Sequence, residues 1–198
     1  MKVKSVEGML GSNTFVMTKG ETTIIVEAGA ELDDVLKELK GAKPSAIILT
    51  HEHYDHICYI ADYVDAFDCP IYAHEILIDD LKRGSFKNIL RSIVLPEHMD
   101  NFEPVKSDFK IGEFNIQPIM APGHSPSSIV FKIDDNLFTG DVLFSFSIGR
   151  TDFMEDGPRI MNRTLKNLLQ QEFTTAYHGH GGESSYKEQI ANIKRFAM

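Results

Sequence analysis

The sequence predicts an α/β domain in which two β-sheets pack together with helices on their outer faces. Three observations lead to this prediction. Strand-like runs precede helical patterns in both halves of the chain, no repeat or low-complexity linker divides it, and 198 residues suit one sizeable domain. We therefore expect a four-layer α/β/β/α sandwich over residues 1–198, with no separate C-terminal helical domain.

The first half of the chain alternates short strands with helices. Two β-like runs, Asn13–Thr18 and Thr22–Glu27, are separated by turn residues. A helix is predicted over Glu31–Lys40, because its apolar residues recur at helical spacing and a glycine follows as a stop. The apolar run Ala46–Thr50 is typical of a buried central strand. The remaining elements are a helix over Asp55–Phe67, a strand over Pro70–Ala73 and a helix over Glu75–Lys82.

The second half begins with a poorly patterned segment, Ser85–Phe102, which Pro96 interrupts. We interpret it as an insertion near the surface or a site mouth, and as the first candidate for a loop that sets specificity. Strand-like alternation resumes over Phe109–Lys132. The last elements are strands over Asn136–Thr139 and Thr174–Tyr177, and helices over Met161–Gln170 and Ser184–Phe196.

Composition excludes several classes of protein. The formal net charge of −9 disfavours nucleic acid and anionic membranes as partners, and no basic patch offsets it. No stretch is long and apolar enough to cross a membrane, and the first residues lack the apolar core of a secretory signal. Two cysteines are too few for a disulfide framework, which fits a reducing cytoplasm. We expect a cytoplasmic protein with a small-molecule substrate; the sequence does not set its oligomeric state.

A histidine-rich motif directly follows the strand Ala46–Thr50. It places four potential metal ligands within six residues: His51, His53, Asp55 and His56. A rigid strand end followed by a turn lets the first two ligands point one way and the last two another, so that the motif can serve two ions. Imidazole nitrogen and carboxylate oxygen suit zinc, iron or manganese and disfavour calcium. The alternative is a solvated polar loop with incidental histidines.

Three later strand ends carry further potential ligands. His124 and Asp141 each follow a glycine in a tight turn after a predicted strand, and His180 lies between glycines after Thr174–Tyr177. Taken singly, each is more typical of a turn residue or a helix cap. One shared metal centre explains all four strand-end placements together.

The motifs resemble those of the metallo-β-lactamase-fold hydrolases in order, spacing and strand-end context, over nearly the whole chain. Four longer strings resemble the short glyoxalase II-like (hydroxyacylglutathione hydrolase-like) members. They are Pro-Gly-His-Ser at 122–125, Thr-Gly-Asp-Val-Leu-Phe at 139–144, Ser-Ile-Gly-Arg-Thr-Asp-Phe at 147–153 and Gly-His-Gly at 179–181. The resemblance implies that one metal ion is held by His51, His53 and His124. It implies that the second is held by Asp55, His56 and His180, and that Asp141 bridges the two.

Such a ligand set has a chemical logic. Two divalent ions about 3.5–4 Å apart can share a water, and a metal-bound water can reach a pKa of about 7, so no serine or cysteine nucleophile is needed. We expect a binuclear hydrolase whose bridging hydroxide attacks a thioester, such as an S-hydroxyacyl thiol, or a related ester or lactone. Asp55, which would orient the water, and Asp141 are its expected catalytic residues. Zinc is the expected metal, with iron and manganese as alternatives.

Several residues near the motifs have two interpretations. Glu27 replaces an aspartate that such proteins often carry, and we place it outside the ligand set. His178 is either a hydrogen-bonding neighbour of the ligands or, the option we favour, an exposed turn histidine. Arg150 and Asp152 either bind a substrate carboxylate or, as we favour, form a structural ion pair. Cys58 is assigned to the apolar core and not to a reactive thiol.

Other functions share parts of this pattern. Persulfide dioxygenases, which use a single iron, resemble the chain in the histidine motif and in Gly-Arg-Thr-Asp; the Gly-His-Gly string favours the hydrolase. Full-length glyoxalase II enzymes carry a helical domain after the last ligand, whereas 18 residues follow His180, which weakens glutathione specificity. β-Lactam hydrolysis and RNA processing use the same fold, and the acidic charge argues against RNA. The third alternative is a protein that stores or binds metal without catalysing a reaction.

Overall fold

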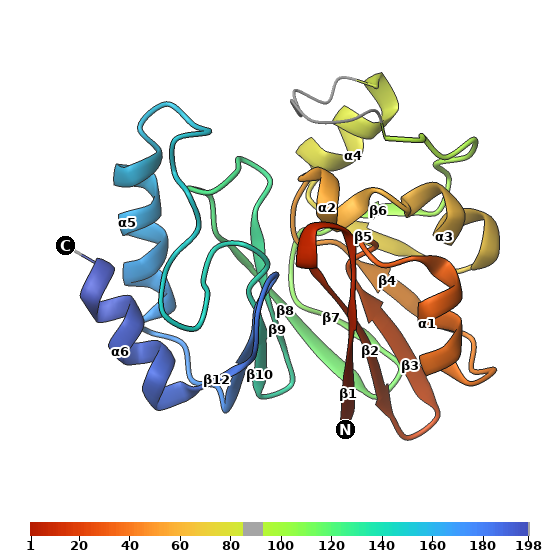
Figure 1. The fold of residues 1–198 in the computed structure, drawn as a ribbon, viewed down its shortest axis with the longest axis horizontal. Coiled ribbons are helices and arrows are strands. Elements are labelled where there is room, and N and C mark those ends of the chain that lie inside the picture. The colour runs from red at the N-terminus through yellow and green to blue at the C-terminus, as the bar shows by residue number, and fades with distance from the viewer. Residues whose placement is uncertain (85–92, 198) are drawn as a thin grey trace.

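The computed structural model describes residues 1–84 and 93–197, and it contains two six-stranded sheets packed face to face. Figure 1 shows helices on the outer side of each sheet, so the predicted four-layer sandwich is confirmed. The helices beside the first sheet are α1 (Leu32–Leu39), α2 (Tyr54–Ile57), α3 (Ile60–Ala66) and α4 (Glu75–Arg83), and those beside the second are α5 (Gly157–Leu168) and α6 (Tyr186–Phe196). No helix in these described residues is long and apolar enough to span a membrane.

The first sheet runs in chain order from β1 to β6. Its strands are β1 (Lys2–Glu7), β2 (Asn13–Lys19), β3 (Thr22–Val26), β4 (Ala46–Ile48), β5 (Ile71–Ala73) and β6 (Phe102–Pro104). The strands from β3 onward are parallel, so their carboxyl ends lie along one edge. Strand β1 was not predicted. It is an edge strand with one buried side chain, Val6, and so has no apolar run to announce it.

The second sheet has the order β12-β11-β10-β9-β8-β7. Its strands are β7 (Phe109–Ile111), β8 (Phe114–Met120), β9 (Ile129–Ile133), β10 (Asn136–Phe138), β11 (Thr175–Tyr177) and β12 (Ser184–Ser185). Strands β10 and β11 are parallel, so the loops that follow them emerge side by side. A Met9–Gly11 turn of 3₁₀ helix joins β1 to β2.

Two predicted elements need correction. The helix expected over Asp55–Phe67 is two helices, because the backbone of Ala28 donates to His56 O (2.8 Å) and accepts from Tyr59 N (3.1 Å) at the break. The last helix begins at Tyr186, with Ser185 and Glu188 forming a capping box, and the residues before it pair as β12. Of the expected insertion at 85–102, residues 85–92 lie outside the described residues.

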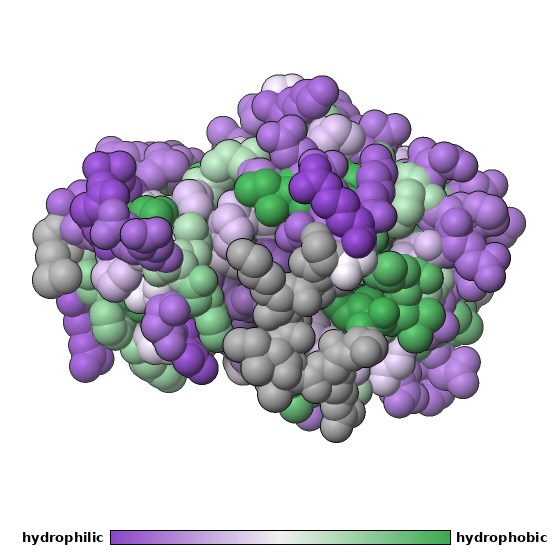
Figure 2. Space-filling model, turned by 90° about the horizontal axis from the view of Figure 1, so that it is seen from above, coloured by the Kyte–Doolittle hydropathy of each residue, from purple (hydrophilic) through white to green (hydrophobic). Residues whose placement is uncertain are grey.

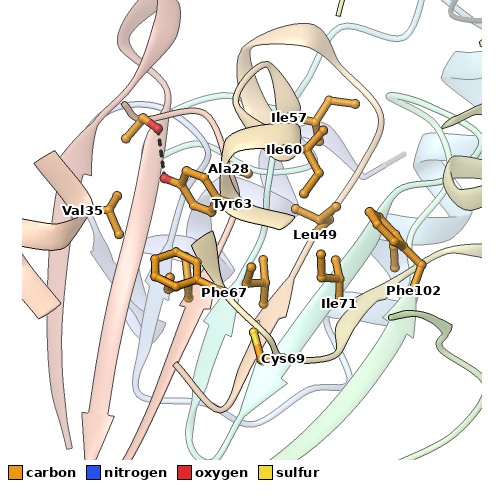
Figure 3. Packing of buried hydrophobic residues seen from close by; sticks show 14 of the residues in the cluster. Ala28, Val35, Leu49, Ile57, Ile60, Tyr63, Phe67, Cys69, Ile71 and Phe102 are labelled. Atoms are coloured by element: carbon orange, nitrogen blue, oxygen red, sulfur yellow. Dashed lines mark hydrogen bonds between the residues drawn. The ribbon is translucent and has the colours of Figure 1, made fainter. Parts of the chain in front are cut away.

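Three apolar clusters hold the layers together. One packs α1, α3 and α4 on the first sheet, one fills the space between the sheets, and one packs α5 and α6 on the second sheet. Figure 3 shows the first cluster, in which Leu49 and Ile71 of the sheet face Ile60 and Tyr63 of α3. The buried Tyr63 hydroxyl donates to Ala30 O at 2.9 Å, so its polar atom is satisfied. This packing fixes the edge from which the ligand loops emerge.

Candidate metal centre

All seven predicted ligands come together between the two sheets, at the carboxyl ends of their strands. The loop after β4 carries His51 and His53, the short helix α2 that follows carries Asp55 and His56, and single ligands follow β8, β10 and β11. The described residues form three possible ligand groups there, each with its atoms within 4.8 Å of one another: His51, His53, His124 and Asp141; Asp55, His56 and His180; and Glu27, His51 and His56. We call His51, His53 and His124 the tri-histidine subsite, and Asp55, His56 and His180 the aspartate subsite.

In the tri-histidine subsite His51 and His124 are buried and His53 is half-buried, and hydrogen bonds hold two of the rings on the side away from the site. Nδ1 of His51 lies 2.9 Å from the Thr50 hydroxyl, and Nδ1 of His124 donates to Arg150 O at 3.0 Å. Each contact leaves Nε2 of the ring as the inward atom. Nε2 of His124 and Nδ1 of His53 are 2.7 Å apart, so the three rings converge on one point.

The aspartate subsite is more open. Oδ2 of Asp55 lies 3.0 Å from Nε2 of His180 and 3.7 Å from Nε2 of His56. The His56 side chain is fully buried, whereas that of His180 is 29% exposed. One ligand of this group therefore faces the mouth of the site.

Asp141 lies between the subsites. Its Oδ1 is 3.2 Å from Nε2 of His56, and its Oδ2 is 3.6 Å from Nε2 of both His124 and His180. Gly179 packs so closely that a Cβ there would overlap Oδ1 of Asp141, so a side chain at this position would displace the carboxylate. This is the position that a bridging ligand requires.

Burial and charge separate the subsites electrostatically. Burial lowers the pKa of His51 and brings that of His124 to about 4. Burial also opposes a charge on His56, but the carboxylates of Asp141 and Glu27 outweigh it and raise the pKa of His56. The hydrogen bond with Asp55 raises the pKa of His180. The tri-histidine subsite is therefore neutral at pH 7, whereas protons compete for the aspartate subsite.

The donor atoms fit divalent metal ions. Nε2 of His51 and Oδ1 of Asp141 are buried, and within residues 1–84 and 93–197 neither makes a hydrogen bond. Buried polar atoms of this kind are costly unless they are paired. Burial raises the pKa of Asp141, but His56, His180 and His124 outweigh it and lower that pKa to about 2, so the carboxylate is ionised. Neutral imidazoles around a carboxylate are what zinc, iron or manganese binds.

Glu27 supports both subsites from behind, although its position in the sequence shows only that it follows a strand. Its carboxylate accepts from the backbone N of Thr50 (3.3 Å) and from the Thr50 hydroxyl, which in turn contacts His51. Its Oε1 is 3.7 Å from Nδ1 of His56. Its carboxylate also forms a possible ligand group with His51 and His56, so the place of Glu27 outside the ligand set stays a prediction.

Glu52 ties two ligand loops together, and sequence reasoning missed it. Its Oε2 accepts from the hydroxyl of Ser125 (2.7 Å) and from that of Ser127. Both serines are buried, and they follow the ligand His124 directly. The interval Ser125-x-Ser127 after a ligand was the available signal, but hydroxyls have too many uses for spacing alone to reveal this one.

The structure decides among the double interpretations. The favoured assignment of His178 was wrong: the side chain is buried, with Nδ1 2.9 Å from the Thr139 hydroxyl and Nε2 2.9 Å from the Ser184 hydroxyl. Its predecessor Tyr177 ends a strand inside the sheet, which carries the next residue inward. Burial lowers the pKa of His178 to about 4, so it is neutral.

The predicted ion pair is present. Arg150 donates to Asp152 through Nε (3.0 Å) and Nη2 (2.6 Å), with both side chains exposed. Cys58 is half-buried, less so than a core assignment implies, and its Sγ lies 3.7 Å from Gly29 O. Burial raises the pKa of the Cys58 thiol to about 12, which makes it a poor nucleophile.

Comparison with known proteins gives the family. The family model described as "Metallo-beta-lactamase superfamily" matches residues 8–184. The chain belongs to the metallo-beta-lactamase superfamily. It is similar to "Probable metallo-hydrolase YqgX" of Bacillus subtilis, with 32% identity over 89% of this chain and 88% of that protein.

Two solved structures of this superfamily fold are similar over almost their full length. The crystal structure of BLEG-1 B3 metallo-beta-lactamase has a TM-score of 0.85 and 26% identity and covers 100% of both chains. That of TTHA1623 in a di-iron-bound form has a TM-score of 0.75 and 27% identity, covering 99% of this chain and 98% of that one. Superfamily membership and the His/Asp cluster together indicate a metal-dependent hydrolase with divalent ions.

Proposed function

We propose that the protein is a binuclear-metal hydrolase of thioesters, of the S-hydroxyacyl thiol type, or of related esters and lactones. The observation that carries the proposal is the pair of ligand groups on either side of one carboxylate, Asp141. The tri-histidine subsite would hold one ion, the aspartate subsite the other, and Asp141 would contact both. The donor set suits zinc best, and the di-iron form of TTHA1623 keeps iron as the alternative.

The protein's own groups define the rest of the mechanism. Two bound divalent ions supply Lewis acidity and lower the pKa of water. Asp55, which faces both His56 and His180, is placed to accept a hydrogen bond from the attacking water and to orient it. Glu27, through Thr50, keeps the His51 ring in place, and Glu52 does so for the loop of His124. Neither cysteine is needed, in agreement with the raised pKa of Cys58 and of Cys69.

The test is a panel of substrates assayed with protein of measured metal content. We expect about two zinc ions per chain and hydrolysis of S-hydroxyacyl thioesters, with slower turnover of lactones and simple esters. Oxygen uptake with a persulfide and one iron per chain would instead identify a persulfide dioxygenase and refute the hydrolase proposal.

β-Lactam hydrolysis is a second candidate, favoured by the likeness to BLEG-1 B3 metallo-beta-lactamase over the whole chain. The same centre could attack a strained amide, because the nucleophile and the polarised carbonyl are common to both reactions. The panel therefore includes a chromogenic cephalosporin. A kcat/KM for the cephalosporin above that for every thioester would favour this second candidate.

A further inference from the structure

An exposed aromatic side chain lies directly on the tri-histidine subsite. The ring centroid of Phe153 is 5.1 Å from that of His53 and 5.6 Å from that of His124, in edge-on contact. The side chain is nonetheless 49% exposed. A large apolar group half open to solvent is costly unless something covers it, and here it adjoins the atoms where catalysis would occur.

The Arg150–Asp152 pair stands over this ring. Cζ of Arg150 lies 4.6 Å from the centroid of Phe153, within cation–π range. Both Nε and Nη2 of the guanidinium already donate to the two carboxylate oxygens of Asp152. The backbone O of Arg150 also accepts a hydrogen bond from Nδ1 of His124. Direct contacts therefore link the Phe153 ring, the Arg150–Asp152 pair and the ligand His124. We call Arg150, Asp152 and Phe153 the aromatic platform.

The charge of the platform determines what it can recognise. Asp152 occupies the Nε and Nη2 donors on one edge of the Arg150 guanidinium and balances its positive charge, so a substrate carboxylate would meet an ion pair without net charge. What the platform presents next to the metal ligands is an apolar surface without net charge. Figure 2 shows apolar patches among the polar side chains on the face of the molecule that is seen from above.

A second aromatic ring lies at the other end of the same loop. Phe144 is 6.1 Å, centroid to centroid, from His180 of the aspartate subsite. Its backbone O accepts from the side chain of Asn192 (2.9 Å) in α6, which fixes the loop to the outer helix layer. An aromatic ring thus adjoins each subsite, and the more exposed one, Phe153, is on the tri-histidine side.

We infer that the aromatic platform binds the acyl group of the substrate and selects acyl groups whose far end is uncharged and apolar. This inference rests on the proposed hydrolase function. The contact with Phe153 supplies the affinity, and Asp152 disfavours acyl groups with a terminal carboxylate because it balances the charge of Arg150 and repels a second carboxylate. Removing the charge of Asp152 should therefore open the platform to acidic acyl groups.

The test compares two thioesters of one thiol, pentanoyl and glutaryl, which differ in whether the acyl chain ends in a methyl or a carboxylate group. We expect kcat/KM of the wild type to favour pentanoyl by about tenfold. Phe153→Ala should abolish that preference, mainly through KM, and Phe153→Leu should retain part of it. Asp152→Asn should raise kcat/KM for glutaryl by about tenfold, since it frees the guanidinium.

The matched control is Asp79→Asn, which removes the acid of another exposed arginine–aspartate pair, that with Arg83 on α4. Asp79→Asn should leave the ratio of kcat/KM for the pentanoyl thioester to that for the glutaryl thioester unchanged. A wild type that prefers glutaryl, or an Asp152→Asn variant that changes both thioesters alike, would overturn the inference.

A binding experiment keeps this inference separate from the proposed function. Isothermal titration calorimetry would measure the Kd of two thioethers of the same thiol, S-pentyl and S-(4-carboxybutyl), for the metal-loaded wild type and Phe153→Ala. We expect tighter binding of S-pentyl, and loss of the difference in the variant. Failure of the protein to hydrolyse any thioester or ester would refute the hydrolase, whereas equal binding of the two thioethers would refute the platform.

Discussion

The two halves of the centre differ in how the chain holds them. The tri-histidine subsite is largely buried and uncharged, and Thr50 and Arg150 O position the rings of His51 and His124. The aspartate subsite has one ligand 29% exposed and two histidines whose pKa values nearby carboxylates raise. The chain thus builds two neighbouring candidate metal sites that differ in burial and in charge. We expect the tri-histidine subsite to hold its ion firmly and the aspartate subsite to exchange its ion.

The largest effect is expected at the residue that belongs to both halves. Asp141→Ala should remove most of the bound metal and nearly all turnover, because its carboxylate faces both ligand groups. Replacing a residue that only supports metal ligands typically costs about ten- to a hundredfold in metal affinity or activity. Loss of a ligand itself should therefore lower kcat by more than about a hundredfold. Metal content by elemental analysis and thioester turnover check this. Asp79→Ala, an exposed carboxylate on α4, is the control, and wild-type activity in Asp141→Ala would defeat the bridging role.

Lowering the pH should remove the metal ion from one subsite before it removes the ion from the other. A proton and a metal ion compete for the same imidazole nitrogen, so a histidine with a raised pKa loses its ion at higher pH than one with a lowered pKa. His56 and His180 have raised values, whereas His124 remains neutral down to about pH 4. As the pH is lowered, the protein should first lose one ion of two, from the aspartate subsite. Dialysis at stepwise lower pH, followed by metal analysis, measures the loss of each ion. Simultaneous loss of both ions would contradict the expected difference between the subsites.

A smaller effect should distinguish the two supporting carboxylates. Glu52 accepts hydrogen bonds from the loop of His124, so Glu52→Ala should weaken metal affinity at the tri-histidine subsite by about tenfold. Glu27 contacts groups of both subsites, and Glu27→Ala should weaken both.

Cobalt-substituted protein provides the measurement, since the two Co²⁺ ions absorb differently in different ligand sets. Glu52→Gln keeps an acceptor oxygen for the serines and should restore most of the affinity. An equal loss of metal affinity at both subsites in Glu52→Ala would show that Glu52 supports the whole centre and not one subsite.

The smallest effect concerns the thiol beside the aspartate subsite. With a pKa of about 12, Cys58 should react with iodoacetamide at pH 8 far more slowly in the native protein than in urea. Native-state treatment should leave metal content and turnover unchanged. Intact-mass spectrometry follows the labelling, and rapid native labelling with loss of one ion would mean that the exchangeable site includes a reactive thiol.

Much of this architecture follows from the sequence because its signals are local. The apolar run at Ala46–Thr50 and the ligand motif after it define a strand and a turn within a few residues. The position of Asp141 between the subsites needed the resemblance to a known family, since no local pattern specifies it. The packing of Gly179 on that carboxylate then agrees with it.

The missed features depend on contacts between distant segments. The break between α2 and α3 is made by the backbone of Ala28, and buried His178 is held by Thr139 just after β10 and by Ser184 of β12. The link from Glu52 to Ser125 spans 73 residues. Such pairings are tertiary, and no periodicity in one segment reveals its partner in another.

One contact at the edge of the centre has a consequence for how the protein folds. The Asn13 side chain in β2 donates to His178 O (3.0 Å) and Gly181 O (2.8 Å), joining segments 165 residues apart. The loop that carries His180 is therefore completed only when the first and last parts of the chain have met, which is a late and entropically costly closure. A bound ion at this loop would act as a cross-link on that closure, so chelation should speed global unfolding and not merely empty a site.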